Sequence, residues 1–205
     1  MRRHVWSLLF PRVYEAVMGL FERTRLARWR RSMVRPANGL VLEIGAGTGL
    51  DFGYYVSGTT VIASDPDVGM LERARQKAGT AAATVLLVAA DAEALPFRRG
   101  TFDTGVGGLV LCTIPDPGRA LAEVRRVLKR GASLRLLEHV RMPNRWVARV
   151  QASLTPIWMR IARGCRLDRD AVEIVTRAGF ALESVVAHAG GYVVEIVGRP
   201  LPPRD

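Results

Sequence analysis

Two acidic residues and three alternating glycines are the part of this chain that could bind a small charged ligand. Glu43 lies at the end of an apolar run, and Gly45, Gly47 and Gly49 follow it. Glycine permits positive φ and lets a ligand lie against the backbone. The start of a following helix would offer unpaired N–H groups to a carboxylate or phosphate. Asp65 ends a second apolar run, where a carboxylate can accept both hydroxyls of a ribose. The pattern predicts a nucleotide-type site.

The spacing of the glycines distinguishes between nucleotides. A dinucleotide fingerprint requires Gly-x-Gly-x-x-Gly, but the third required position counted from Gly45 is Leu50. Glu43 stands two residues before the first glycine, where a carboxylate can receive an ammonium group. An acid, a Gly-x-Gly-x-Gly turn and the ribose acid Asp65 together resemble the class I S-adenosylmethionine-dependent methyltransferases.

The resemblance continues from about residue 39 to residue 139. The segment 91–97 resembles the family's adenine-binding segment, and Phe102-Asp103 opens a strand similar to its fourth. The segment 127–132 resembles its Leu-x-Pro-Gly-Gly turn, with Arg130 and Ala132 in place of Pro and Gly. The resemblance implies S-adenosyl-L-methionine as cofactor. It implies cofactor contacts by Glu43, Gly45, Ala46, Gly47, Gly49, Asp65, Pro66, Met70, Asp91, Ala92 and Leu109.

Strand and helix patterns alternate after residue 39, which predicts an α/β fold with a Rossmann-like, doubly wound, mostly parallel sheet. The predicted parallel strands cover 40–44, 59–64, 84–89, 103–110 and 132–139, and the helices between them cover 49–56, 67–78 and 117–129. An amphipathic stretch over 143–163 is interrupted by Pro156, and Asp168 can cap a helix over 169–178 that ends at Gly179. Strands at 181–187 and 192–198 would form the antiparallel hairpin of a seven-stranded sheet. The motif residues then share the carboxyl edge of the sheet.

The N-terminal region is basic and amphipathic. Residues 1–38 contain nine arginines and two glutamates, in a chain of net charge +11. Apolar residues recur at helical spacing over 5–34, with Arg30 mainly on the polar side. We expect residues 1–38 to form a helical arm or lid and residues 39–205 to form the cofactor-binding domain. The arm could close over the cofactor, pack on the sheet edge, or contact an anionic membrane. The length fits one domain overall, and the apolar runs are too short to span a bilayer, so a cytoplasmic protein with optional peripheral membrane contact is expected.

The methyl acceptor is less well defined by the sequence. The ends of the fourth and fifth strands carry Cys112 and His139, and together with Trp158 and Cys165 they resemble the alkyl-thiol methyltransferase-like branch. Tyr14, Cys112, His139 and Trp158 are the candidate pocket residues. His139 could deprotonate an acceptor or could be structural. The two cysteines lie far apart in sequence, which predicts neither a disulfide nor a metal site.

The sequence therefore predicts a methyltransferase for a small apolar acceptor, either a thiol or a lipid-like molecule. Phospholipid N-methylation and quinone-type C-methylation are the alternatives. A nucleic-acid substrate is disfavoured because the segment 107–110 lacks the tetrad that base-flipping methyltransferases carry after the fourth strand. A cofactor-binding protein without catalytic activity is a further alternative.

Overall fold

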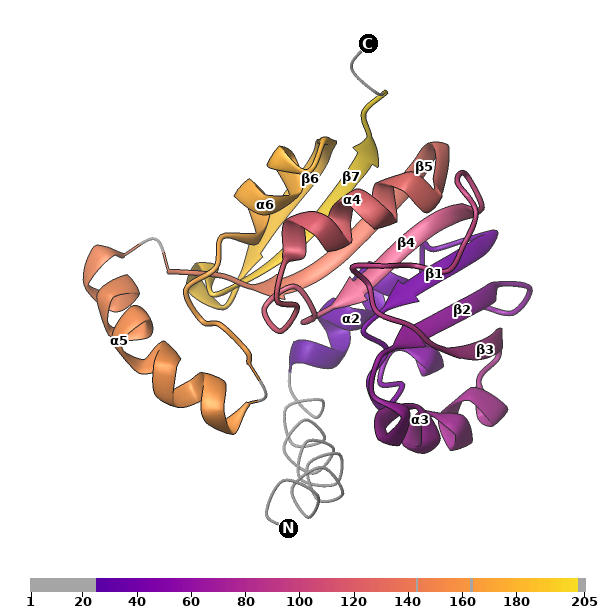
Figure 1. Ribbon diagram of the computed structural model, residues 1–205, viewed down its shortest axis with the longest axis horizontal. Helices are drawn as coiled ribbons and strands as arrows, with labels where there is room; N and C mark the ends of the chain where they lie inside the picture. Colours follow the sequence, from indigo (N-terminus) through magenta and orange to yellow (C-terminus); the bar gives the residue numbers. More distant parts are fainter. Residues whose placement is uncertain (1–24, 143, 163, 203–205) are drawn as a thin grey trace.

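Seven strands form a single sheet in the order β3-β2-β1-β4-β5-β7-β6 (Figure 1). The computed structural model describes residues 25–142, 144–162 and 164–202. The strands are β1 (Leu40–Ile44), β2 (Thr60–Asp65), β3 (Thr84–Ala89), β4 (Phe102–Gly108), β5 (Leu128–His139), β6 (Phe180–His188) and β7 (Val193–Pro200). The first five are parallel, whereas β7 is antiparallel to both β5 and β6. The predicted fold class, including the closing hairpin, is confirmed.

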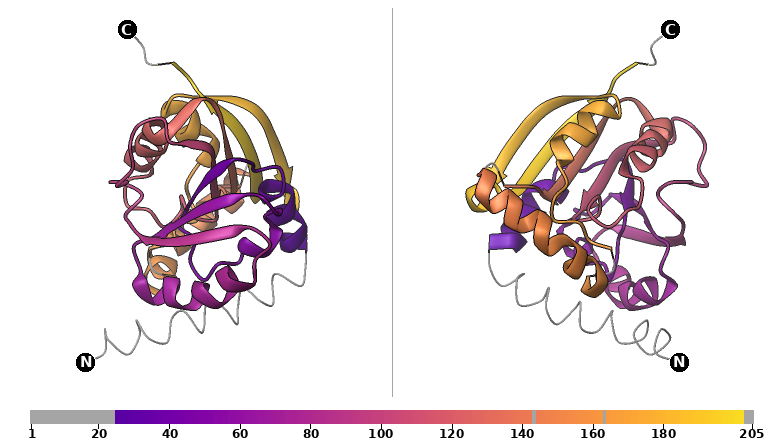
Figure 2. Two further views of the ribbon diagram at one scale, coloured as in Figure 1. Left: turned by 90° about the vertical axis from the view of Figure 1, so that its right-hand side faces the viewer. Right: turned by 60° about the vertical axis from the view of Figure 1, so that its left-hand side comes forward.

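Helices cover both faces of the sheet, and an apolar core lies under each layer (Figures 1 and 2). On one face, α4 (Pro117–Val127) and α6 (Ala171–Arg177) bury their apolar sides against β1, β4 and β5. On the other face, the core is formed with α2 (Arg25–Val34), the short 3₁₀ helix η1 (Phe52–Tyr54) and α3 (Val68–Thr80). A second 3₁₀ turn, η2 (Ala189–Gly191), joins β6 to β7. This arrangement leaves the carboxyl ends of the parallel strands at one edge.

The helix predicted directly after the glycine turn is wrong. Instead of a helix over 49–56, the chain forms turns and then η1, which is a single short turn. Asp51 stands at the N-cap position of η1, but its side chain makes no capping hydrogen bond there. Its carboxylate instead pairs with the buried guanidinium of Arg30 at 3.0 Å. The glycine turn is therefore not followed by an α-helix that could direct its dipole at an anion.

Two boundaries in the C-terminal half also differ from the prediction. The helix after residue 168 is capped by Asp170, whose carboxylate accepts from the backbone N–H of Glu173 at 3.0 Å, and Asp168 instead pairs with Arg166. The amphipathic stretch forms one helix, α5 (Arg145–Ile161), which continues through Pro156 rather than breaking there. Pro156 has no backbone N–H, so α5 lacks one backbone hydrogen bond there. The helix is capped at its N-terminus by Asn144.

The N-terminal prediction is tested only in its last third. Residues 25–34 form α2 as expected, whereas the earlier part of the predicted helix, including Tyr14, lies outside the described residues. Arg30 does not lie on the polar side, because its side chain is buried in the ion pair with Asp51. The division between an arm over 1–38 and a domain over 39–205 stays a prediction.

Candidate active site

The glycine turn is held in shape by two close packing contacts. Gly45 and Gly49 both have positive φ, at +62° and +74°. A Cβ on Gly45 would lie 2.1 Å from Cγ2 of Val110, and one on Gly49 would lie 2.6 Å from the Phe52 ring. These two glycines are therefore required by backbone conformation and by space alike.

Gly47 differs from its neighbouring glycines. Its φ is +55°, and the nearest atom to an added Cβ would be the carbonyl oxygen of Gly45 at 3.9 Å. The backbone at Gly47 therefore borders open space, which a ligand could occupy. Thr48, the next residue, is buried, and its Oγ1 makes no hydrogen bond within the described chain. An open backbone surface beside an unpaired buried hydroxyl fits a polar ligand bound along this turn.

Asp65 connects the glycine turn to the turn after β2. One carboxylate oxygen accepts from the backbone N–H of Gly47 at 2.9 Å, and the other accepts from that of Asp67 at 2.9 Å. Asp67 in turn caps α3 by accepting from Gly69 and Met70. A carboxylate oxygen has two lone pairs, so one backbone contact each is compatible with accepting ribose hydroxyls. The predicted ribose acid thus also shapes the cofactor turn, a role that the sequence did not indicate.

Glu43 lies beneath the glycine turn rather than on its surface. Its side chain is buried, and the hydroxyl of Tyr55 donates to its Oε2 at 2.7 Å. Burial raises the pKa of Glu43 well above its ordinary value, and the negative charge of Asp51 raises that pKa further. A ligand's ammonium group would offset both effects, because an adjacent positive charge favours the ionised carboxylate. The predicted partner of the ammonium group is therefore chemically suited to it.

The remaining predicted cofactor residues lie close to the same edge of the sheet. Asp91 follows β3, and its carboxylate accepts from the backbone N–H of Glu93 at 2.9 Å, while Ala92 is buried in the core. Met70 is buried on α3, and Pro66 is exposed in the turn before it. We call the region formed by residues 43–49, Asp65, Pro66, Met70 and 91–92 the donor side.

Leu109 closes this region with an unusual backbone conformation. It follows β4 directly with a φ of +58°, which is uncommon for a residue other than glycine. Its backbone N–H donates to the carbonyl of Leu137 at 2.7 Å, so the conformation is held by pairing with β5. Backbone strain of this kind is often found beside functional sites.

Three of the four predicted pocket residues meet around Cys165. The ring nitrogen Nε2 of His139 lies 3.1 Å from Sγ of Cys165, and the ligand atoms of Cys112, His139 and Cys165 all lie within 4.8 Å of one another. Trp158 lies beside the Cys165 sulfur and contributes to lowering the pKa of that thiol. We call Cys112, His139 and Cys165 the thiol–imidazole cluster. Both cysteines are free thiols, and the segments after β4 and α5 bring them together although their spacing in the sequence does not indicate it.

Backbone and arginine contacts fix this cluster in place. The N–H of Arg166 donates to the carbonyl of Cys112 at 2.9 Å, which joins the two cysteine segments. The guanidinium of Arg169 donates to the carbonyls of Leu111 and Ile114, and so secures the loop that carries Cys112. The His139 ring stacks on Tyr192, with centroids 5.7 Å apart and an interplanar angle of 9°.

The pKa values of the three groups in the cluster are shifted in different directions. The pKa of Cys165 is lowered to about 4, chiefly because the Cys112 thiol hydrogen-bonds to its sulfur and because His139 lies beside it. The same contact with Cys165, together with burial, raises the pKa of Cys112 well above its ordinary value. Burial lowers the pKa of His139, but the Cys165 thiolate outweighs it and the net pKa is raised. Cys165 is therefore the more acidic of the two thiols, and His139 is the basic group beside it.

Glu138 is a site residue to which the sequence analysis assigned no role. It is fully buried, and its Oε1 accepts from the backbone N–H groups of Val110 and Leu111 at 2.9 and 3.0 Å. Burial raises its pKa to about 7. Its other oxygen, Oε2, is buried without a hydrogen-bond partner among the described residues. Glu138 thus holds the turn between Val110, which packs over Gly45, and Cys112; no motif in the sequence marks this contact.

An open α/β sheet with a Gly-x-Gly-x-Gly turn, and with an acid at or near the carboxyl end of each of the first three strands, is the arrangement expected of a class I methyltransferase. Residues 42–136 match the family model described as a methyltransferase domain. Residues 42–136 thus form a methyltransferase domain, in agreement with the resemblance to the class I S-adenosylmethionine-dependent methyltransferases. The methyltransferase domain and the fold predicted from the sequence are confirmed.

The chain is similar to several characterised methyltransferases. It is 32% identical to human thiol S-methyltransferase TMT1B over 145 residues, covering 69% of this chain and 59% of that protein. It is 32% identical to a phosphatidylethanolamine N-methyltransferase from Cereibacter sphaeroides, covering 59% of this chain and 61% of that protein. It is 37% identical to a demethylmenaquinone methyltransferase from Thermobifida fusca, covering 56% and 51%. The chain thus spans between half and two thirds of the length of these relatives.

The fold is also similar to that of solved structures. A SAM-dependent methyltransferase from Thermotoga maritima superimposes with a TM-score of 0.66 at 21% identity, covering 95% of this chain and 98% of that one.

Proposed function

We propose that this protein transfers the methyl group of S-adenosylmethionine to the sulfur of a small apolar thiol. The observation that carries the proposal is the position of the thiol–imidazole cluster. Cys112 lies two residues beyond Val110, whose side chain packs over Gly45 in the donor side. A group able to accept a thiol proton therefore lies beside the turn proposed to bind the methyl donor.

The donor side would hold the cofactor through its backbone and three acids. Glu43 would receive the ammonium group, Asp65 the ribose hydroxyls, and Asp91 with the backbone of Ala92 the adenine. Gly47 offers the open backbone surface along which the methionine portion can lie. When bound, the cofactor supplies a sulfonium-activated methyl group. The protein's part is to fix the donor so that an acceptor can approach in line.

The acceptor side is formed by the thiol–imidazole cluster and Trp158. A thiol is a nucleophile only as its thiolate, so the acceptor must lose a proton before or during transfer. His139 is the group of the cluster that can take this proton, because contact with Cys165 raises the pKa of its imidazole despite burial. Trp158 adds an apolar wall next to Cys165, which favours an apolar acceptor and excludes water.

A panel of labelled reactions tests the acceptor. The protein would be incubated with methyl-labelled cofactor and with alkanethiols, a quinol precursor, or phosphatidylethanolamine in vesicles. The proposal expects methyl thioether from the alkanethiols and little product from alcohols of matched chain length. Preferred methylation of the quinol or the lipid would assign the acceptor to one of the alternative classes. Cofactor binding without turnover on any acceptor would indicate a binding protein.

A second candidate, methylation of a lipid amine at a membrane surface, is favoured by α5. This helix turns its polar residues Gln151 and Thr155 inward, where both are buried. Gln151 hydrogen-bonds to the backbone of Met142, Val140 and Leu167. Most of the large apolar residues of α5 point outward instead: Trp146, Val147, Val150, Leu154 and Ile157 are all exposed.

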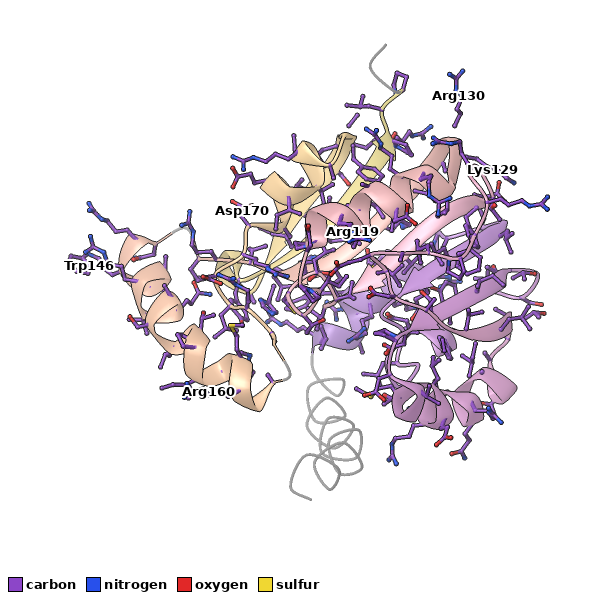
Figure 3. All side chains as sticks on the ribbon, viewed as in Figure 1. Arg119, Lys129, Arg130, Trp146, Arg160 and Asp170 are labelled. Carbon is purple, nitrogen blue, oxygen red and sulfur yellow. The ribbon has the colours of Figure 1, made fainter. Side chains whose placement is uncertain are left out.

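The outward face of α5 has the character of an interfacial helix. Trp146 is 67% exposed at one end, and the guanidinium of Arg149 lies over its ring at 5.0 Å. Trp146 and Arg160 both project from the side of the molecule in Figure 3. Apolar residues beside arginines bind the boundary between anionic headgroups and acyl chains. Among the described residues, no helix is both long and apolar enough to cross a bilayer, so such contact would be peripheral.

Vesicle flotation separates the two candidates. If the protein methylates a lipid amine at a membrane surface, it should bind anionic vesicles at low salt. The double variant Trp146→Ala, Ile157→Ala should bind them more weakly. Arg98→Ala, a change of an exposed residue away from α5, serves as the control. If the wild type does not bind anionic vesicles, or if the double variant binds them as well as the wild type does, α5 no longer supports a lipid acceptor.

A further inference from the structure

The geometry of the thiol–imidazole cluster is close to that of a tetrahedral metal site. The three ligand atoms lie within 4.8 Å of one another, and Nε2 of His139 lies 3.1 Å from Sγ of Cys165. Bond lengths to zinc at a tetrahedral angle place two sulfurs ~3.8 Å apart and a sulfur and a nitrogen ~3.5 Å apart. Small rotations of the side chains would therefore suffice to bring all three ligands to one ion.

The kinds of ligand atom select the kind of metal. Two thiolates and one imidazole suit zinc and other soft or borderline transition metals, whereas magnesium and calcium prefer oxygen. Two cysteines and one histidine form a known three-ligand set in catalytic zinc sites, which keep a fourth position for an exogenous ligand. Cys112 and His139 are buried here, while Cys165 is partly exposed. The partial exposure of Cys165 gives an ion, and then a fourth ligand, a route to the cluster.

The three ligands also come from segments that are already fixed. Cys112 is held by the contacts of its loop with Arg166 and Arg169. The backbone of Val140, next to His139, donates to the carbonyl of Tyr192 at 2.8 Å, and Tyr192 stacks on the His139 ring. A preorganised site loses less entropy when it binds its ligand. The fixed positions of these three residues therefore favour the binding of a metal ion.

The electrostatic surroundings favour a cation as well. The carboxyl group of Glu138, the residue before His139, is buried, and its Oε2 has no hydrogen-bond partner among the described residues. A buried acceptor without a donor is stabilised by a positive charge placed near it. The nearest strong cation, the guanidinium of Arg169, is directed at the backbone carbonyls of Leu111, Ile114 and Pro115.

We infer that Cys112, His139 and Cys165 bind one zinc ion and leave its fourth position open to a ligand from solution. Where the acceptor is a thiol, a consequence that rests on the proposed function, its sulfur would take this position and lose its proton to solvent water on the partly exposed side at Cys165. The metal-bound sulfur would then form its bond to the methyl carbon as the carbon–sulfur bond of the sulfonium breaks. That bond's electron pair stays with the departing sulfur, which becomes a neutral thioether.

Cobalt substitution tests the site without cofactor or acceptor. Tag-free protein with both thiols reduced would be titrated anaerobically with Co²⁺, and thiolate-to-cobalt charge-transfer absorption would be recorded. The chain has only two cysteines, so this absorption reports on Cys112 and Cys165 alone. We expect saturation at one ion per chain, a tetrahedral d–d spectrum and loss of the signal when zinc is added.

Single variants assign the ligands. Cys112→Ser and Cys165→Ser should each reduce the charge-transfer intensity to about half, since each removes one of two thiolates, and the double variant should abolish it. His139→Asn should weaken cobalt binding at least tenfold. His188→Asn, which changes a histidine stacked on Trp29 outside the cluster, should bind as the wild type does. Circular dichroism of each variant checks that it is folded.

The inference is overturned if the folded, fully reduced wild type shows no charge-transfer absorption at excess cobalt. In that case the cluster is a metal-free group of two cysteines and one histidine. It is also overturned if His139→Asn binds cobalt as tightly as His188→Asn does. Thiol methylation is measured separately: metal binding without methylation contradicts the proposed function alone, and methylation by metal-free protein contradicts only the metal site.

Discussion

The donor side and the acceptor side of this molecule are built in different ways. The donor side uses backbone conformation and short turns, so that Gly45 to Gly49 and the following Asp65 lie within a continuous stretch of sequence. The acceptor side is formed by side chains from distant segments, since Cys112, His139 and Cys165 follow different elements. A cofactor shared by a whole family can be bound by backbone, whereas an acceptor that differs between members is recognised by side chains that can change independently.

The largest effect is a loss of stability expected at Gly45, with Gly47 of the same turn as the comparison. Gly45→Ala should destabilise the fold by roughly 2–5 kcal/mol, because the new Cβ combines overpacking with a strained φ. Its Cβ would lie 2.1 Å from the Val110 side chain. Gly47→Ala should cost only about 1–2 kcal/mol of backbone strain, yet it should reduce cofactor affinity at least as much as Asp65→Ala does, because its Cβ enters the open space of the turn.

Urea denaturation and calorimetric titration would measure these two effects. Equal losses of stability in the two variants would contradict the assignment of Gly45 to packing. Unchanged cofactor affinity in Gly47→Ala would contradict the assignment of Gly47 to the ligand.

The next effect separates the two sides. His139→Asn should reduce methyl transfer to an alkanethiol by about 100-fold, a typical loss for a group that manages a proton. Its affinity for the cofactor should stay that of the wild type, because the substitution leaves the donor-side contacts in place. Steady-state kinetics with calorimetry in parallel would measure both. A parallel loss of cofactor affinity would mean that the cluster belongs to the donor side.

A smaller effect is expected at Asp65. Asp65→Ala should weaken cofactor binding by about 1–3 kcal/mol, since both the ligand and two backbone N–H groups lose an acceptor. Asp65→Asn keeps one acceptor oxygen and should lose less. Calorimetric titration of both variants checks this order. A smaller loss of cofactor affinity in Asp65→Ala than in Asp65→Asn would contradict the assignment of the Asp65 carboxylate as a hydrogen-bond acceptor for the cofactor.

The smallest effect concerns pH and Glu43. Because burial raises the folded-state pKa of Glu43 above its ordinary value of 4.5, ionising this group opposes folding. The cofactor-free wild type should therefore lose stability relative to Glu43→Gln as the pH rises from 4.5 through the folded-state pKa. Above that pKa the difference should be constant. The glutamine variant should bind cofactor less tightly, since it cannot pair with an ammonium group.

Thermal unfolding across this pH range, with and without cofactor, would measure the difference. A wild type that gains stability over the variant as the pH rises, in the absence of cofactor, would contradict a burial-raised pKa.

Sequence reasoning recovered the sheet because its evidence is local. Apolar runs placed β1 and β3 at their observed bounds, and the alternation of strands and helices predicted the parallel order. The family's turn and acids predicted the donor side for the same reason. The helix expected after Gly49 failed because Asp51 is used in a buried ion pair with Arg30, a contact over 21 residues that no local pattern carries.

The acceptor side could be predicted only in part. His139 and Cys112 were both predicted at strand ends; His139 ends β5, whereas Cys112 lies in the turn beyond β4, which ends at Gly108. The contact of His139 with Cys165 spans 26 residues and depends on how the chain returns after α5. The support that Glu138 gives to the turn after β4 depends on the pairing of β4 with β5. Such contacts are set by tertiary structure, and a single sequence contains no spacing rule for them.

The most direct test of the account is whether the two sides act together on one substrate. The protein would be given cofactor with a deuterated methyl group and a short alkanethiol, and the products would be followed by mass spectrometry. The account predicts a thioether that carries the deuterated methyl group and one demethylated cofactor for each thioether formed. Protein that binds the cofactor but forms no labelled thioether from any alkanethiol would contradict it.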